Sequence, residues 1–467
     1  MRYVSTRGRA PVLDFEEAML TGLASDGGLY LPEAWPQFSR DDIQAMAGLS
    51  YAEIAARVMA PFVDSWIEPD ELQDLTRETY AVFDHAAVVP MTQLNDNDWL
   101  LELFHGPTFA FKDVALQLLG RLFDRALARR DTRVTIVGAT SGDTGSAAIA
   151  GCAGRERIQT FILFPDGRVS DVQRRQMTTV DADNVHCLAI EGTFDDCQAL
   201  VKAMFGDDQF RRAIGMAAVN SINWARVMAQ IVYYFASAVR LGAPGRDIAF
   251  SVPSGNFGAI FAGFAARKMG LPIARLIIAT NANDILARFV ESGEYRKSTV
   301  VETYSPSMDI QVSSNFERAL FELHDRDGDT IEQLMADLAR NGGFAVGNDV
   351  AGATRQIFDA FRLDDDGILQ EIRRIHGNSG VIVDPHTACG TAAARATGVP
   401  ADVPVIVHGQ AHPAKFPDAV AAAIGHAPPA LDRLAEVMDR PERVEHLPND
   451  LAAVQAFIKK AKTSGGP

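Results

Sequence analysis

The chain has 467 residues, of which 47% are hydrophobic and 22% charged, a balance typical of a soluble globular protein with two or three domains. Its formal net charge is −16, from 44 basic and 60 acidic residues, and no Lys/Arg run is interleaved with aromatic residues. We therefore expect no nucleic-acid partner, and we attribute the acidic balance to solubility.

The cysteines and the N-terminal residues indicate a compartment. None of the four cysteines forms a Cys-x-x-Cys pair, which predicts buried thiols of a reducing compartment and neither a disulfide framework nor a zinc site. Residues 1–8 contain no apolar signal core, and no apolar run is long enough to span a bilayer. We expect a cytoplasmic protein that does not bind a membrane.

Residues 1–95 alternate helical patterns with short turns. Residues 15–23 and 51–59 have the spacing of amphipathic helices, and residues 26–32 form a turn that leads into a short extended piece. This pattern predicts a mainly helical N-terminal domain without a catalytic constellation of its own.

After Trp99 the pattern changes to α/β. Continuous apolar runs at residues 133–138, 160–165, 185–190, 247–252, 275–280 and 403–407 alternate with helical patterns such as 171–179, 195–205 and 224–241. Apolar strands that alternate with helices predict parallel sheets covered on both faces. We expect a catalytic α/β core in two lobes over residues 96–430, a helix-rich acidic insertion at about 317–377, and a C-terminal extension over 431–467 whose last residues are disordered.

Residues 101–117 contain a lysine in an unusual position. From Phe111 onward the apolar residues follow helical spacing, and Pro107 and Thr108 supply a turn and a candidate N-cap before that helix. Lys112 would then lie in the first turn, where burial and the positive helix end both favour the neutral amine. A neutral lysine can hold a carbonyl compound as a Schiff base. From this residue alone, a lysine that snorkels past a core helix is the alternative.

Three further segments place glycine, hydroxyl or polar residues where a strand ends, which is where ligands bind in open α/β sheets. Residues 138–148 match neither a dinucleotide fingerprint nor a Walker loop, and their hydroxyls suit a carboxylate or phosphate. Residues 252–258 can form an anion nest before a helix over 259–268. Residues 405–417 bring His408, Gln410, His412 and Lys415 to a sheet edge, but Pro413 and the lack of a third ligand argue against a metal. A reactive lysine, a phosphate nest and a second anion loop together indicate pyridoxal phosphate, with the second loop for the substrate carboxylate.

The chain resembles the threonine synthase family of fold-type II pyridoxal-phosphate enzymes. The resemblance covers nearly the whole chain and rests on matching segments in the right order, at residues 3–8, 26–32, 105–113, 138–146, 220–226, 253–258, 307–315, 384–387 and 411–416. It is closest to the longer bacterial and fungal form and not to the plant form regulated by S-adenosylmethionine. The family converts O-phospho-L-homoserine and water into L-threonine and phosphate.

The resemblance implies roles for individual residues. Lys112 would be the Schiff-base lysine and, once freed, the general base at the substrate's Cα and Cβ. The cofactor phosphate would bind at Ser254, Gly255, Asn256, Phe257 and Gly258. The substrate carboxylate and the cofactor's 3′-oxygen would meet Ser141, Gly142, Asp143 and Thr144. Candidates for the substrate phosphate are Arg226 and Lys415, with Arg168 and Ser170 as further ones.

One position departs from the family. A threonine usually precedes Ala-His-Pro-Ala-Lys-Phe and meets the pyridine nitrogen, whereas this chain has Gln410, whose amide can also donate. The departure keeps a second enzyme in view, a phospholyase that releases 2-oxobutanoate, ammonia and phosphate. A catalytically silent binding relative is a further alternative, although Lys112 is intact. We expect a small-molecule substrate, no metal, and a monomer or homodimer.

Overall fold

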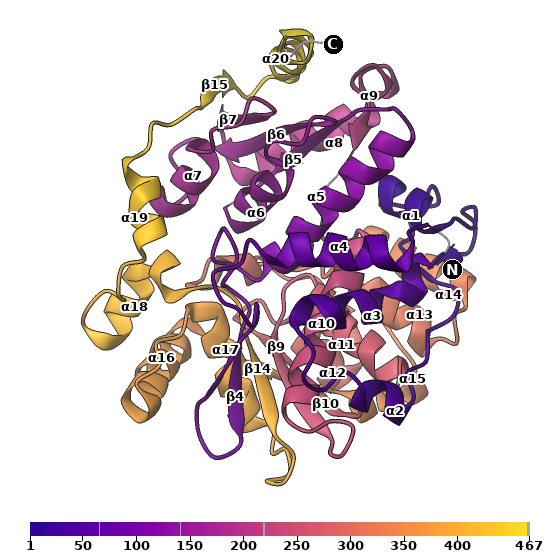
Figure 1. The fold of residues 1–467 in the computed structure, drawn as a ribbon, viewed down its shortest axis with the longest axis vertical. Coiled ribbons are helices and arrows are strands. Elements are labelled where there is room, and N and C mark those ends of the chain that lie inside the picture. Colours follow the sequence, from indigo (N-terminus) through magenta and orange to yellow (C-terminus); the bar gives the residue numbers. More distant parts are fainter. Residues whose placement is uncertain (65, 141, 218–219, 465–467) are drawn as a thin grey trace. The chain divides into compact units, whose positions relative to one another are not determined.

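The computed structural model describes residues 1–64, 66–140, 142–217 and 220–464. Contacts divide the chain into two compact units, which we call the large unit (Met1–Phe111 and Ser221–Pro429) and the small unit (Lys112–Asn220 and Ala430–Pro467). Figure 1 labels the elements of both. The domain boundaries expected from the sequence stay a prediction. Within the described ranges no helix is long and apolar enough to cross a membrane.

A six-stranded sheet forms the centre of the large unit. Its strand order is β13-β10-β9-β14-β4-β3, and all neighbours are parallel except β3 and β4. The strands are β3 (Met91–Gln93), β4 (Asp98–Glu102), β9 (Ile248–Pro253), β10 (Ile273–Thr280), β13 (Phe358–Arg362) and β14 (Val405–Gly409). Because β9, β10 and β14 are parallel, their carboxyl ends share one edge of the sheet.

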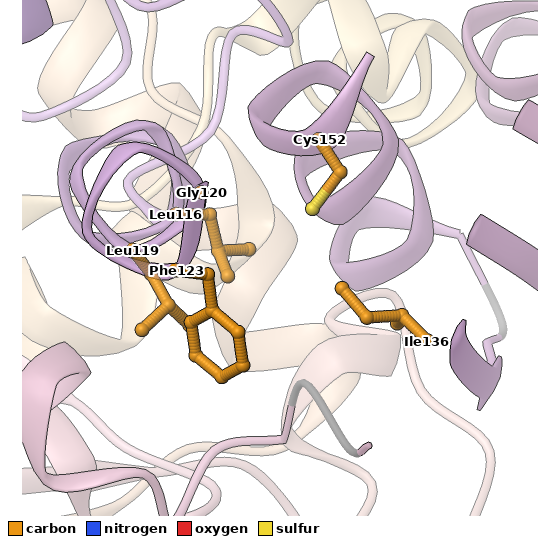
Figure 2. Close-up of a pocket in the computed structure, with 6 residues that line it drawn as sticks. All are labelled: Leu116, Leu119, Gly120, Phe123, Ile136 and Cys152. Atoms are coloured by element: carbon orange, nitrogen blue, oxygen red, sulfur yellow. The ribbon is translucent and has the colours of Figure 1, made fainter. Parts of the chain in front are cut away.

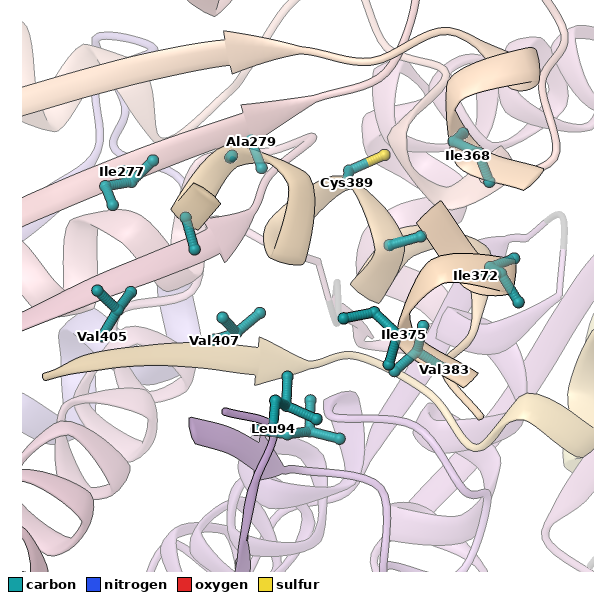
Figure 3. Packing of buried hydrophobic residues seen from close by; sticks show 14 of the residues in the cluster. Leu94, Ile277, Ala279, Ile368, Ile372, Ile375, Val383, Cys389, Val405 and Val407 are labelled. Atoms are coloured by element: carbon teal, nitrogen blue, oxygen red, sulfur yellow. The ribbon is translucent and has the colours of Figure 1, made fainter. Parts of the chain in front are cut away.

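Helices bury the apolar strands of this sheet. The helices α10 (Trp224–Arg240) and α11 (Gly258–Lys268) pack on each other, and α17 (Pro385–Ala396) packs on β9, β10 and β14. Figure 3 shows Cys389 of α17 in one core with Ile277, Val405 and Val407 of the strands. Ile372 of α16 (Asp365–Ser379) belongs to the same core. The start of α17 is therefore held rigidly at the sheet edge.

The N-terminal part of the large unit contains the antiparallel strand pair β1 (Tyr3–Ser5) and β2 (Tyr30–Pro32) and the helices α1 (Phe15–Thr21), α2 (Arg40–Gln44), α3 (Tyr51–Val63) and α4 (Pro69–Tyr80). The helix α3 packs on α10. Arg7 donates to Glu317 of α13 (Phe316–Leu323) through Nε at 3.0 Å and Nη2 at 3.1 Å. A two-point bond of this kind ties the N-terminal segment to the body of the unit.

The remaining part of the large unit lies between β10 and β14 and directly after β14. It contains α12 (Ile285–Ser292), α14 (Gly328–Asn341), α15 (Asn348–Ile357), α18 (Pro417–Ile424), the short 3₁₀ turns η1 (Pro306–Met308) and η2 (Pro413–Lys415), and the strand pair β11 (Glu294–Arg296) and β12 (Gly343–Ala345). The region expected as a helix-rich insertion also contributes β13, which pairs with β10 at the sheet edge.

The small unit is built on five parallel strands in the order β15-β7-β6-β5-β8. They are β5 (Val134–Ala139), β6 (Ile158–Pro165), β7 (Val185–Glu191), β8 (Met216–Ala217) and β15 (Glu445–Pro448). The helices are α5 (Lys112–Arg129), α6 (Asp143–Cys152), α7 (Asp171–Thr178), α8 (Phe194–Gly206), α9 (Asp208–Ile214), α19 (Asp432–Asp439) and α20 (Leu451–Ser464). Val454 and Ile458 of α20 lie in the core formed with Phe161 and Leu163 of β6.

Two glycines bring α5 and α6 together. A Cβ on Gly120 would lie 2.0 Å from the carbonyl oxygen of Gly151, so only glycine fits at this crossing. Figure 2 shows the apolar pocket beside the crossing, where Phe123 of α5, Ile136 of β5 and Cys152 of α6 face one another. The close approach fixes α6, and with it the loop before α6, relative to the start of α5.

The expected α/β class with parallel sheets is confirmed. The predicted N-cap at Thr108 is wrong, because the helix begins only at Lys112. Thr108 lies instead in a turn closed by the Phe109 N–H on the Gly106 carbonyl at 3.1 Å. Only the next residues are extended, since Ala110 forms a bridge with Ala411 and the Phe111 N–H donates to the Gln410 carbonyl at 2.8 Å.

Candidate active site

Lys112 is the first residue of α5, and its side chain is only 10% exposed. Its Nζ lies 3.8 Å from Oδ2 of Asp143, the first residue of α6. A carboxylate at this distance stabilises the protonated amine, and so opposes the effects of burial and the helix end. The sequence pattern predicted the buried lysine but did not indicate that Asp143 would face it.

Asp143 is held by a residue that the sequence analysis missed. Gln173 of α7 donates from Nε2 to Oδ1 of Asp143 at 3.0 Å. The other carboxylate oxygen, Oδ2, is directed toward Lys112. The same glutamine covers Gly142, where an added Cβ would lie 2.5 Å from Gln173 Cδ. Gly142 also has a φ of +148°, which glycine adopts without strain. The sequence carried no signal for this contact, because the burial of Gln173 and its bond to a residue 30 positions away appear only in the structure.

The loop before α6 is shaped by one hydroxyl. Thr140 Oγ1 accepts the backbone N–H groups of Gly142 at 3.1 Å and Gly145 at 2.9 Å. Thr144 follows in the first turn of α6 and is half-buried. Ser141, which we also expected in the substrate site, lies outside the described residues. The loop thus places Gly142, Asp143 and Thr144 at the start of a helix, where an anion is stabilised.

In the large unit, the segment from Ser254 to Gly258 joins β9 to α11. Phe257 has a φ of +62°, in the left-handed region, and no side chain caps the N-terminus of α11. Alternation of this kind turns successive backbone N–H groups inward and makes an anion nest at a positive helix end. Ser254 adds a buried hydroxyl. The backbone of this segment therefore has a shape that suits an anion.

Gln410 directly follows β14, the strand beside β9. Its backbone N–H donates to Oγ1 of Thr387 at 2.9 Å. The side chain is 6% exposed, and its Nε2 has no hydrogen-bond partner within the described ranges. A buried donor without a partner costs free energy, which an acceptor on a bound molecule would recover.

Arg226, in the first turn of α10, is a buried cation. It is 4% exposed, Nε and Nη1 find no hydrogen-bond partner in the part of the chain that the structure describes, and burial lowers its pKa to about 10. A buried guanidinium in this state is suited to receive an anion. Lys415 is also buried, and its Nζ donates to the Thr108 carbonyl at 2.8 Å.

The two further candidates for the substrate phosphate differ from these. Arg168 is exposed, and Ser170 is the N-cap of α7, whose hydroxyl accepts from the Gln173 N–H. A helix cap already explains Ser170.

The two histidines of residues 405–417 lie in surroundings that indicate a structural role. His408 is fully buried against the rings of Tyr233, Tyr234 and Phe250, and burial lowers its pKa to about 3. His412 is partly buried, and burial lowers its pKa to about 4. No group of three or more His, Cys, Asp or Glu residues in the described ranges could hold a metal ion.

The residues present fit pyridoxal phosphate. The nest at Ser254–Gly258 suits its phosphate, the orphaned amide of Gln410 suits its ring nitrogen, and Lys112 offers a buried primary amine. These three features are the ones that the cofactor requires of a protein.

Comparison with known proteins identifies the family. Profiles match for the threonine synthase N terminus at residues 2–80, for a pyridoxal-phosphate dependent enzyme at 88–409 and for the threonine synthase C-terminal region at 387–458. The threonine synthase of Pseudomonas aeruginosa is 54% identical over 100% of both chains. The chain belongs to the threonine synthase family.

Solved structures agree with this assignment. The pyridoxal-phosphate-bound threonine synthase from Brucella melitensis is 52% identical, covers 99% of each chain and has a TM-score of 0.97. The yeast threonine synthase is 39% identical over 99% of each chain, with a TM-score of 0.95. The predicted pyridoxal-phosphate enzyme, which forms L-threonine and phosphate from O-phospho-L-homoserine and water, is confirmed over the phospholyase and the silent relative.

Proposed function

We propose that, in the threonine synthase reaction, Lys112 is both the residue that holds the cofactor and the base that moves protons on the substrate. The observation that carries this assignment is the buried Nζ of Lys112, 3.8 Å from Asp143 Oδ2. When bound, pyridoxal phosphate supplies an electron sink for charge that develops at the substrate's Cα and Cβ. Lys112 accepts and returns the protons at these carbons, and Asp143 stabilises its ammonium form after each acceptance.

The remaining residues bind and orient. Ser254, Gly255, Asn256, Phe257 and Gly258 hold the cofactor phosphate through backbone N–H groups and the Ser254 hydroxyl. Gln410, whose buried Nε2 has no hydrogen-bond partner among the described residues, would donate to the ring nitrogen. A neutral amide there leaves that nitrogen unprotonated, in contrast to a carboxylate, which would favour its protonation.

The substrate is held by its two anionic ends. Gly142, Asp143 and Thr144, with Ser141 beside them in the chain, receive the carboxylate at the start of α6. Asp143 would also lie beside the cofactor's 3′-oxygen, as the family resemblance implies. Arg226 neutralises the phosphate that leaves from Cγ, and its lack of a partner among the described residues supports that role. Lys415, whose Nζ donates to the Thr108 carbonyl at 2.8 Å, is assigned to the same phosphate.

The experiment is to reduce the holoenzyme with borohydride, digest it and map the peptide that carries the cofactor. We expect one labelled peptide, modified at Lys112, because this buried lysine at the start of α5 has a carboxylate neighbour. Lys415 is an internal competitor, since it is buried as well. A label on Lys415, or one spread over surface lysines, would overturn the assignment.

The domain roles and the setting of the enzyme complete the proposal. Residues 96–430 form the catalytic core, residues 1–95 an N-terminal domain and residues 431–467 an extension. We assign the enzyme to the cytoplasm, where its four thiols stay reduced, and to a monomer or homodimer. Size-exclusion chromatography with light scattering distinguishes the two assemblies.

A further inference from the structure

The segment Asp384–Thr387 has no part in the proposed reaction, yet it is almost completely buried. Asp384 is 0% exposed, His386 3% and Thr387 1%. The three residues form the N-cap and first turn of α17, where the Asp384 carboxylate accepts the backbone N–H groups of His386 at 2.9 Å and Thr387 at 3.4 Å. A capping role alone explains the aspartate but not the buried imidazole.

On one side, this turn fixes the end of β14. Asp384 Oδ2 accepts the Thr387 hydroxyl and, at 3.3 Å, the backbone N–H of Ala411. The Thr387 oxygen in turn accepts the N–H of Gln410 at 2.9 Å. The backbone of the residue assigned to the ring nitrogen is therefore held by Asp384, directly at Ala411 and through Thr387 at Gln410.

On the other side, His386 reaches the η1 turn. Its Nε2 lies 3.2 Å from the backbone nitrogen of Ser307, and its Nδ1 lies 2.8 Å from Oδ1 of Asp384. A backbone N–H can only donate, so Nε2 must be the acceptor and carry no proton. The ring proton is then on Nδ1 and is donated to Asp384. The geometry thus specifies one neutral tautomer of His386.

The η1 turn lies directly against the phosphate nest. A Cβ on Gly255 would be 3.0 Å from the Ser307 carbonyl oxygen and 3.3 Å from Cα of Met308. A few residues later, the Ser313 hydroxyl donates to the Gly255 carbonyl, and the Asn315 N–H donates to the Asn256 carbonyl at 3.0 Å. Residues 307–315 therefore support the backbone whose N–H groups form the nest.

We propose that His386 is a positioning residue that, through its Nδ1-protonated ring, locks the Ser307 turn behind Gly255 and so connects the phosphate nest to the same carboxylate that fixes Gln410. The inference rests on the proposed placement of the cofactor phosphate at Ser254–Gly258. One buried carboxylate, Asp384, then sets both ends of the cofactor site within the large unit. Phe416, whose ring packs on the imidazole at 5.0 Å between centroids, keeps the ring in this plane.

The test uses two substitutions at His386, each of which keeps one of the two hydrogen-bonding positions of the imidazole ring. His386→Asn keeps a donor at the Nδ1 position but cannot reach Ser307, and His386→Gln places an acceptor near the Nε2 position. The full-length protein, stripped of cofactor, is titrated with pyridoxal phosphate and with pyridoxal, which lacks the phosphate. Thermal unfolding is followed in parallel, and His426→Asn, at an exposed position of the same unit, is the matched control.

For His386→Asn we expect the dissociation constant of pyridoxal phosphate to rise about tenfold, as for one lost hydrogen bond, and that of pyridoxal to change less than about twofold. His386→Gln should recover most of the affinity for pyridoxal phosphate. Nitrogen-15 NMR of the histidine ring should show the Nδ1-protonated tautomer. Equal losses for both ligands, equal losses for both variants, unchanged affinities, or a charged or Nε2-protonated ring would each overturn the proposal.

Ser254→Ala separates this inference from the placement on which it depends. If Ser254→Ala leaves the advantage of pyridoxal phosphate over pyridoxal intact, the placement of the cofactor phosphate fails. If it removes that advantage while the His386 variants keep it, the nest is correct and only the positioning role of His386 fails.

Discussion

The two units contain different kinds of chemical group. The large unit offers backbone N–H groups at Ser254–Gly258 and the neutral amide of Gln410, whereas the small unit offers the ionisable pair Lys112 and Asp143. Backbone N–H groups do not titrate and have no side-chain rotamers, so they suit the binding of a phosphate group that does not react. A lysine and a carboxylate exchange protons, so they suit the atoms that do react. Binding and proton transfer can therefore be altered separately.

The largest effect is expected from Lys112→Ala, which removes the reacting amine from the small unit. Turnover of O-phospho-L-homoserine should fall by at least about a thousandfold, since the nucleophile and the base are lost together. The fold should persist, because alanine is a strong helix former at the start of α5. Phosphate release measures the effect, and exposed Lys202→Ala on α8 is the control. Turnover within tenfold of wild type would contradict the role of Lys112.

Gly120→Ala should damage the small unit without touching a reacting group. Its Cβ would meet the Gly151 carbonyl at 2.0 Å, so α5 and α6 must separate, at a cost of about 3 kcal/mol or more. Limited proteolysis should cut preferentially within residues 112–220. Gly206→Ala, at the end of α8 where a Cβ meets nothing within 4 Å, should be tolerated. Equal stability of the two variants would show that the glycine crossing does not hold the helices.

Low pH should lower the stability of the large unit, because His408 and His412 resist protonation in the folded state. Burial lowers their pKa values from 6.5 to about 3 and about 4, so below pH 6.5 the unfolded chain binds protons that the folded chain refuses. The free energy of unfolding should therefore fall as pH falls, by about 1.4 kcal/mol per pH unit for each fully buried histidine. Above pH 6.5, the contribution of these histidines to the free energy of unfolding does not change with pH.

His408→Phe isolates this effect, since aromatic rings already surround the site. Urea unfolding between pH 4 and pH 7 should give a shallower slope for this variant than for wild type. Exposed His426→Gln should leave the slope unchanged. An unaltered slope in His408→Phe would mean that His408 is not the group that resists protonation.

Gly255→Ala tests the binding of the cofactor phosphate by the large unit alone. The new methyl group would press on Ser307 and Met308 at 3.0 to 3.3 Å, so the nest must shift by a few tenths of an ångström. We expect about tenfold weaker binding of pyridoxal phosphate with normal folding. Fluorescence titration measures the change, with Gly352→Ala on α15, where a Cβ meets nothing within 4 Å, as the control. Undiminished affinity would show that the nest tolerates displacement.

The smallest effect is expected where the C-terminal extension meets α7. Glu442 accepts from Arg174 and, at 2.7 Å, from the Thr178 hydroxyl, so Glu442→Gln should loosen this segment by about 1 kcal/mol. Arg443→Ala, which loses only ion pairs with the exposed Asp181 and Asp183, should cost less than about 0.5 kcal/mol. Hydrogen exchange over residues 440–448 measures both. A larger effect from Arg443→Ala would reverse the ranking.

The hydrophobic periodicity of the sequence was sufficient to predict most of the fold. It was insufficient to predict the side-chain contacts of the candidate site. The strands β6, β7, β9 and β10 were predicted within two residues of their ends, because continuous apolar runs have few alternative structures. The edge strand β13 was missed, since its polar Asp359 and Arg362 give no continuous apolar run. Within the candidate site, Lys112 and the nest were expected from local pattern. The Gln173–Asp143 bond was not, because it joins residues 30 positions apart.

The small unit is assembled from two stretches of the chain that are far apart in the sequence, and β15 and α20 come last. During synthesis, β5 to β8 leave the ribosome long before the strand that pairs with β7 and the helix that covers β6. Until translation ends, one edge of this sheet and part of its apolar core lie open to chaperones. A premature stop codon between Pro429 and β15 would therefore leave the gene product with a complete large unit and an unfinished lysine-bearing unit.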